Sequence, residues 1–181
     1  PHTEISNYTK QKEILEGRVK TLHPKIFGGL LSTNSKKHQN EIVKEKMVNF
    51  DILIVNLYPF EETVKNFKKF EEIIEMIDIG GHSLIRAAVK NYRKTIPVVD
   101  PRDYNSLINN FPKTDLARKK YAIKAMQQIS EYDIAISNWF QGINTEQYEL
   151  RYGENPQQKA VALVNKNSFK QVSGQKELSY N

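Results

Sequence analysis

Two short runs of aliphatic residues limit the folds that this chain can adopt. The first, Ile52 to Val55, lies between Asp51 and Asn56, and the second is Thr95 to Val99. Unbroken aliphatic runs of this length are typical of strands that are buried on both faces in a parallel sheet. Because helical patterns separate the two runs, the sequence predicts a layered α/β fold with a mostly parallel sheet flanked by helices.

Amphipathic helical patterns surround these two strands. A further helix is expected to begin at Asp100 and Pro101, since a proline in the first turn gives up no hydrogen bond. The segments with helical spacing are Lys10–Glu16, Ser35–Val48, Phe70–Ile77, Ser83–Val89 and Thr114–Phe140. On the last of them, the positions expected to be buried are Ala117, Tyr121, Ala125, Ile129 and Ile136.

The composition changes near residue 141. Residues 141–149 are polar and are expected to form a linker, and Ala160–Val164 has the pattern of another strand. The interpretation is a first domain over residues 1–140, followed by the start of a second α/β domain over residues 150–181. Because the first residue is Pro1 rather than Met, we expect the chain to be an excerpt from a longer polypeptide.

The composition argues against several classes of protein. The 181 residues include no cysteine, which excludes disulfides and thiolate nucleophiles and fits a reducing, cytoplasmic compartment. The four histidines lack metal-ligand spacing, so no metal site is expected. No apolar run reaches the roughly 18 residues that span a bilayer, so no membrane partner is expected.

The net charge of +6 allows two kinds of anionic partner. A basic protein binds nucleic acid or attracts small anions. The lysines are spread along the chain and no motif of stacking aromatic residues accompanies them, which argues against nucleic acid. The charge therefore indicates, weakly, a small anionic ligand.

The stretch from Gly17 to Gly29 has the composition of an anion-binding loop. Arg18 and Lys20 are two positions apart, so in an extended segment both side chains point to the same side, where a phosphate or carboxylate fits. The alternative, which composition alone favours, is that both are solvated surface cations. His23 precedes Pro24 and is expected to be a packed or hydrogen-bonded loop residue.

Two further motifs carry polar groups at the ends of predicted elements. Asn56 and Tyr58 follow the first strand, where ligands of parallel sheets bind; the alternative is that Tyr58 caps the core at the end of the strand. Asp78 precedes the double glycine, where free backbone N–H groups suit an anion, but an aspartate there is also a common helix cap. If residues 81–90 form one helix, Lys90 lies roughly 13 Å along the axis and outside a small site around Asp78.

Five short motifs occur across the chain in a fixed order. They are GRVKTLHP at Gly17–Pro24, NLYPF at Asn56–Phe60, IDIGG at Ile77–Gly81, IRAAVKN at Ile85–Asn91 and LRYGENP at Leu150–Pro156. Together they closely resemble the family of bifunctional AICAR transformylase/IMP cyclohydrolases of purine biosynthesis. The resemblance covers nearly the whole chain.

The resemblance implies a methylglyoxal-synthase-like α/β fold for the first domain. It also implies that a cyclohydrolase closes formyl-AICAR to IMP with loss of water and without a cofactor. The second domain would belong to a transformylase that formylates AICAR from 10-formyltetrahydrofolate. The family further suggests a homodimer, and it has an N-terminal strand and phosphate-binding loop that are not present in this sequence.

Residue roles follow from the resemblance, position by position. The implied catalytic residues are Lys20, Tyr58, Asp78 and Lys90, with Asp78 as a base and Lys90 as a proton donor and acceptor. The implied substrate-binding residues are Arg18, Val19, Thr21, Val55, Asn56, Ile79, Gly80 and Gly81. Arg151 and Tyr152 match AICAR contacts of the transformylase. The alternative function is a non-catalytic nucleotide-sensing domain of the same fold.

Overall fold

The computed structural model describes residues 2–66, 69–142, 145–150 and 160–165. It divides into two compact units, residues 1–132 and 133–181, which are considered separately below. Within the described residues the helices are α1 (Ile5–Thr9), α2 (Pro24–Leu31), α3 (Lys36–Lys44), α4 (Phe60–Asn66), α5 (Phe70–Glu75), α6 (Gly80–Lys90), the 3₁₀ helix η1 (Pro101–Asp103), α7 (Tyr104–Asn109) and α8 (Asp115–Phe140). The strands are β1 (Ile52–Ile54), β2 (Ile96–Val98), β3 (Thr145–Leu150) and β4 (Ala160–Asn165).

The first unit is built around a parallel pair of strands. β1 and β2 pair in parallel with Ile52 opposite Ile96, as the two aliphatic runs predict. The ladder continues past β1, because the N–H of Val55 donates to the carbonyl of Val98 at 3.0 Å. The carboxyl ends of both strands therefore lie at the same edge of the sheet.

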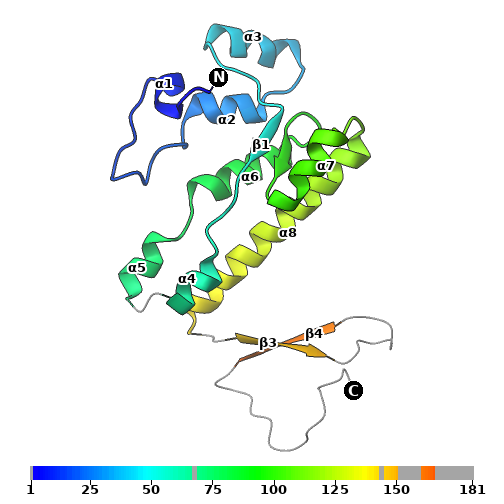
Figure 1. Cartoon of the computed structure of the whole chain (residues 1–181). Helices are drawn as coiled ribbons and strands as arrows, with labels where there is room; N and C mark the ends of the chain where they lie inside the picture. Colours follow the sequence, from blue (N-terminus) through cyan, green and yellow to red (C-terminus); the bar gives the residue numbers. More distant parts are fainter. Residues whose placement is uncertain (1, 67–68, 143–144, 151–159, 166–181) are drawn as a thin grey trace, which may run out of the picture. The chain divides into compact units, whose positions relative to one another are not determined.

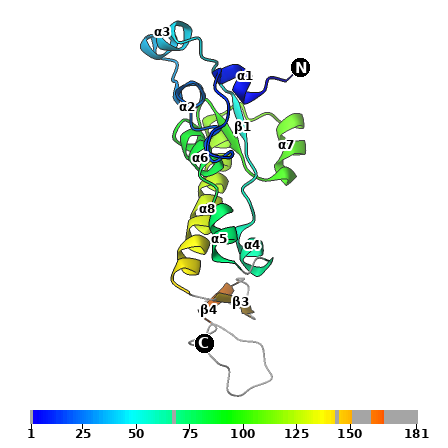
Figure 2. The ribbon, with the colours of Figure 1, turned by 90° about the vertical axis from the view of Figure 1, so that its left-hand side faces the viewer.

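Helices cover both faces of this strand pair (Figures 1 and 2). Figure 2 shows α7 on one side of β1 and α2 and α6 on the other. On the α7 side, Ile96 and Val98 pack against Leu107. The opposite side is divided between two clusters, one formed by α2 and α6 around Ile26, Leu30, Leu84 and Ala87, and one formed by α6 and α8 around Ile85, Val99, Ala125 and Ile129.

The two strands differ in burial, which corrects one expectation. β2 is buried throughout, whereas Ile54 of β1 is 53% exposed, so β1 is not buried on both faces. Within the described residues β1 pairs with β2 alone, and α7 packs over Ile96 and Val98 of β2. The Ile54 side chain consequently remains partly uncovered.

The prediction of a helix over Lys10–Glu16 is also wrong. Helix α1 ends at Thr9, and the residue after it, Lys10, has a φ of +62°. Leu15 and Glu16 have φ of +54° and +56°, which a right-handed helix does not allow. Instead, the N–H of Ile14 donates to the carbonyl of Val19 at 3.1 Å, and the chain reverses between them.

Most other predicted helices are present, with shifted ends. Ser35 caps α3, Asp100 caps η1, and α8 covers almost all of the predicted Thr114–Phe140. Ala125 and Ile129 are buried as expected, whereas Ala117, Tyr121 and Ile136 are only half-buried. The sequence patterns predict no helix at α4, because Pro59 indicates only the end of a strand, although prolines also precede helices.

The second unit contains an antiparallel pair, β3 and β4, with Thr145 opposite Asn165. β4 confirms the strand predicted at Ala160–Val164. Residues 145–150 were expected to belong to a polar linker or its boundary, and they form β3 instead. The polar composition of these residues favours a linker, whereas their antiparallel pairing with β4 makes them a strand.

Candidate active site

Two glycines at the start of α6 bring three distant segments together. A Cβ atom on Gly80 would lie 2.6 Å from Oγ1 of Thr21, and one on Gly81 would lie 3.0 Å from Cγ1 of Val55. The loop after α1, the end of β1 and the start of α6 therefore meet at this point. Such close approach requires residues without a side chain, which explains the double glycine of the IDIGG motif.

Asp78 is fixed at the amino end of α6. Its Oδ1 accepts from the N–H of Gly81 at 2.6 Å, and its own N–H donates to the hydroxyl of Tyr132 at 2.7 Å. A carboxylate at this position is favoured by the helix dipole. The helix-capping alternative for Asp78 is therefore present in the structure. The same contact places its carboxylate against Gly81, where a Cβ atom would lie 2.7 Å from Oδ2 of Asp78 and 3.0 Å from Cγ1 of Val55.

The loop carrying the GRVKTLHP motif is a tight turn. Residues 15–18 reverse the chain, with positive φ at Leu15, Glu16 and Gly17. Left-handed conformations cost non-glycine residues about 1–2 kcal/mol each. The expectation of an extended segment at Arg18 is thus wrong. Within the described residues, Arg18 and Lys20 do not share a partner.

Each of these two cations instead contacts a carboxylate. The guanidinium of Arg18 pairs with Glu75 of α5 through two nitrogens, one of them Nε at 3.1 Å from Oε2. This hydrogen-bonded pair raises the pKa of Arg18. Lys20 Nζ lies 3.3 Å from Oε2 of Glu13. All four side chains are exposed, so an anionic ligand can compete for both cations without a large desolvation cost.

His23 is part of the scaffold, as expected. Its Nδ1 accepts from the N–H of Lys25 at 3.1 Å and caps α2, whose first residue is Pro24. The cap fixes the point at which the loop joins the helix. Val19 pairs with Ile14 across the turn.

Asn56 and Tyr58 lie beyond the end of β1. Nδ2 of Asn56 donates to the hydroxyl of Tyr104 at 3.2 Å, and Tyr58 is 54% exposed. The exposure of Tyr58 contradicts the alternative in which it caps the core. Asn56 follows Val55 at the carboxyl edge of the strand pair, and Tyr58 lies two residues further on, in irregular chain.

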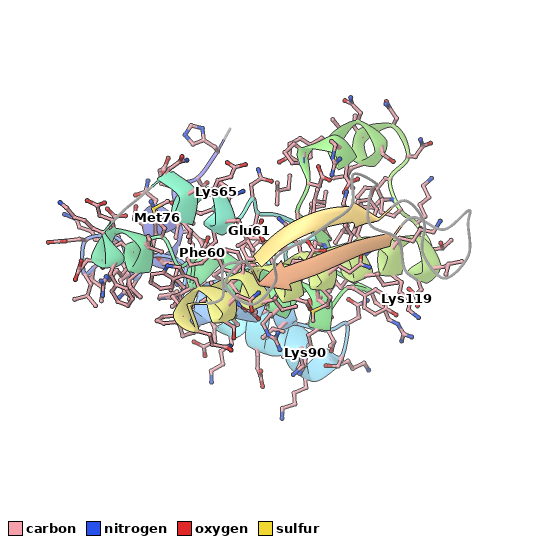
Figure 3. All side chains as sticks on the ribbon, turned by 90° about the horizontal axis from the view of Figure 1, so that it is seen from below. Phe60, Glu61, Lys65, Met76, Lys90 and Lys119 are labelled. Carbon is pink, nitrogen blue, oxygen red and sulfur yellow. The ribbon has the colours of Figure 1, made fainter. Side chains whose placement is uncertain are left out.

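Lys90 is not brought to this cluster. α6 runs without a break from Gly80 to Lys90, which separates the two residues by roughly 15 Å along the axis. Figure 3 shows Lys90 well apart from Met76, which precedes Asp78 by two positions. The predicted separation of Lys90 from Asp78 is therefore confirmed within this chain.

Several site neighbours were missed by sequence reasoning. Tyr132 contacts Asp78 across 54 positions, and its ring also lies against those of His82 and Phe60. Glu75 and Tyr104 likewise contact site residues 57 and 48 positions away. A single sequence offers no signal for such pairs, because each depends on how distant elements pack.

Part of the predicted site lies beyond the described residues. Arg151 and Tyr152 fall there, and with them the LRYGENP motif after Leu150. Among the described residues, no cluster of three or more histidine, aspartate or glutamate side chains is arranged to hold a metal ion. None of the helices in that part of the chain is long and apolar enough to cross a membrane.

Comparison with known proteins gives consistent matches along the chain. The family described as AICARFT/IMPCHase bienzyme matches residues 88–181, and the MGS-like domain matches residues 1–83. The crystal structure of ForH superposes with a TM-score of 0.63 and 25% identity, covering 75% of this chain and 74% of that chain. The expected α/β fold of the methylglyoxal-synthase type is thereby confirmed.

Curated relatives are more similar in sequence. The bifunctional purine biosynthesis protein PurH of Prochlorococcus marinus (strain MIT 9515) is 44% identical over 200 residues, covering 100% of this chain and 38% of that protein. The protein of the same name from Rhodospirillum rubrum is 42% identical over 205 residues, covering 100% of this chain and 39% of that protein. The chain thus spans about two fifths of the length of these relatives. With the match over residues 88–181, they show that the chain belongs to the AICARFT/IMPCHase bienzyme family.

Proposed function

We propose that the full-length protein closes formyl-AICAR to IMP and also formylates AICAR with 10-formyltetrahydrofolate. The observation that carries the cyclohydrolase proposal is the packing of Thr21, Val55 and Asp78 around Gly80 and Gly81, in a chain of this family. The alternative of a non-catalytic nucleotide-sensing domain is not favoured, because the relatives over the whole chain are named as biosynthetic proteins.

Ring closure is limited by a poor nucleophile. The carboxamide nitrogen of formyl-AICAR attacks the formyl carbon, loses a proton, and water then leaves to give IMP. Orientation and a base contribute most to such a step. Asp78 is the base, and the backbone around Ile79, Gly80 and Gly81 holds the carboxamide.

The formyl oxygen gains negative charge during the attack. Lys20 and Tyr58 are proposed to donate to it, and their exposure leaves both able to reach a bound ligand. Arg18, Val19, Thr21, Val55 and Asn56 are proposed to hold the nucleotide. For Arg18 this requires the substrate anion to replace Glu75.

Lys90 requires a different explanation. Its place at the end of α6 keeps it from Asp78 of the same chain. We propose that the protein is a homodimer, in which Lys90 meets groups of the second subunit. Ultracentrifugation of the full-length protein tests this, and a monomer at assay concentration would contradict it.

The remaining assignments concern the whole protein. We propose a cytoplasmic enzyme whose cyclohydrolase domain includes residues 1–140. The transformylase domain would include β3, which pairs with β4, and would have Arg151 and Tyr152 as AICAR contacts. The cyclohydrolase step needs no cofactor, and the folate serves the transformylase.

The decisive experiment compares Asp78→Asn with the wild type in a formyl-AICAR cyclisation assay. Asparagine retains an oxygen that accepts from the N–H of Gly81, so the cap survives while the base is lost. We expect kcat to fall by about a hundredfold or more. Lys20→Ala should lower it by a similar factor, since a donor to the oxyanion is removed.

Two matched variants control for nonspecific effects. Asp51→Asn changes an exposed aspartate at the opposite end of β1, and Lys44→Ala removes an exposed lysine at the end of α3. Both should keep wild-type rates. Near-normal cyclisation by both site variants would contradict the proposed site.

A further inference from the structure

A hydrogen bond joins the ends of the two parallel strands. Asn56 follows β1 and Tyr104 begins α7 after β2, and Nδ2 of Asn56 donates to the Tyr104 hydroxyl at 3.2 Å. Asn56 is exposed, whereas Tyr104 is half-buried. A residue from the β2 side of the sheet thus holds a residue of the proposed nucleotide site.

The ring of Tyr104 is held by packing. It lies against the cluster of Ile96, Val98 and Leu107, together with the ring of Tyr121 from α8. A tyrosine packed in this way presents its hydroxyl from a constant position, because its apolar body is held by its neighbours while its hydroxyl has a polar partner.

The turn before Tyr104 is held by charge. Asp100 caps η1 by accepting from the N–H of Arg102 at 2.9 Å. Lys124 of α8 places Nζ 2.8 Å from Oδ2 of Asp100 and 2.7 Å from Oδ2 of Asp103. One ammonium therefore ties α8 to the two ends of the turn that leads into Tyr104.

The contact also orients the carboxamide of Asn56. When Nδ2 donates to Tyr104, Oδ1 points away from that hydroxyl and is presented as an acceptor. Without a fixed partner, an exposed carboxamide turns freely about its last torsion, and orienting it then costs binding free energy. Formyl-AICAR carries N–H groups on both its carboxamide and its formamide.

We propose that Tyr104 is a positioning residue for the cyclisation: its hydroxyl orients the carboxamide of Asn56, so that Oδ1 accepts an N–H of the substrate. This inference rests on the proposed cyclohydrolase function. It adds a residue outside the five sequence motifs. It also gives the Asp100–Lys124–Asp103 cluster a role in holding that residue in place.

The test is a double-mutant cycle in the full-length enzyme. Tyr104→Phe removes only the hydroxyl, and we expect kcat/KM for formyl-AICAR to fall about three- to tenfold, mainly through a higher KM. In an Asn56→Ala background the same change should alter kcat/KM less than about twofold, since the partner is already gone. Tyr121→Phe, in the same apolar cluster, should keep wild-type values.

The possible outcomes separate this inference from the proposed function. A wild-type enzyme that does not cyclise formyl-AICAR would overturn both. An active wild type whose kcat/KM is unchanged by Tyr104→Phe, or falls equally with and without Asn56, would overturn the inference alone. If Tyr104→Phe lowers the urea midpoint and reduces kcat instead of raising KM, the role of Tyr104 is structural. This outcome would also overturn the inference.

Discussion

Thr21 and Gly80 show how closely the loop after α1 lies against α6. The 2.6 Å between Oγ1 of Thr21 and the place of a Cβ on Gly80 leaves no room for a methyl group. At most exposed helix positions, alanine is more stable than glycine by about 1 kcal/mol. At residue 80 the clash with Thr21 opposes this preference. Whether alanine raises or lowers the unfolding free energy there therefore depends on Thr21.

We predict that Gly80→Ala destabilises the protein by about 1–2 kcal/mol and lowers cyclisation, because the loop must move away. Thr21→Ala in the same chain should restore much of the unfolding free energy, since the clashing oxygen is removed. Urea denaturation of the two single variants and the double variant measures the coupling. Additive effects would contradict the close approach of these two residues.

The contacts of the site cations explain why their geometry could not be predicted. The sequence places Arg18 and Lys20 near a glycine-bearing turn, and that much is correct. Their partners Glu75 and Glu13 depend on the positive φ values of residues 15–17, which follow from no residue preference at Leu15 or Glu16. The charge pattern therefore predicts the residue types of the site but not which groups they contact.

Helix α2 contains a natural pair of test positions. Gly28 and Gly29 are adjacent, but they face different neighbours. A Cβ on Gly28 would meet the end of the flexible Met47 side chain at 2.5 Å, whereas one on Gly29 would meet the backbone carbonyl of Val48 and the ring of Phe50. The side chain can move, and the backbone cannot.

We therefore predict that Gly28→Ala changes the unfolding free energy by less than about 1 kcal/mol, with the helix preference for alanine offsetting the displacement of Met47. Gly29→Ala should cost about 1–3 kcal/mol, because α2 is forced away from the segment leading into β1. Thermal and urea unfolding of the two variants measure the difference. Equal losses in both would contradict the described packing of α2.

At the scale of elements, the predictability of each segment has a physical reason. Thr95–Val99 is an unbroken buried run, and it forms β2 as expected. Lys10–Glu16 has helical spacing, but α1 ends at Thr9 and Lys10 is left-handed, so the helix does not continue into this segment. The contact between Asn56 and Tyr104 depends on the exact pairing of β1 with β2. A single sequence predicts that the fold has a parallel sheet, but not which side chains meet at its edge.

In the first unit, Lys124 connects α8 to the η1 turn that follows β2. Its ammonium meets Asp100 and Asp103, and Arg102 also pairs with Asp100. The hydrogen bonds from Arg102 and then from Lys124 hold the pKa of Asp100 well below its usual range. Deprotonation of Asp100 is thus linked to the folded state.

The stability of the whole unit should therefore depend on Asp100 in acid. A carboxyl whose pKa is lowered by folding stabilises the protein above its unfolded value of about 3.9, and this contribution is lost as the pH falls below that value. We predict that Asp100→Asn is less stable than the wild type at pH 6, and that the difference shrinks at pH 3. Urea midpoints at both pH values measure it, and a constant difference would contradict the linkage.

The parallel register of β1 and β2 also has a consequence for how the chain folds. Thr95 Oγ1 donates to the carbonyl of Phe50 at 2.7 Å, across 45 positions, at the start of the two strands. Parallel pairing of this kind requires closure of a long loop before it gains any hydrogen bond, whereas α8 forms from contacts within one turn. The refolding rate should thus be limited by the meeting of these two strands, with α8 and α6 already helical when they do. The edge that carries Asn56 and Tyr104 would then be among the last parts of the unit to become ordered.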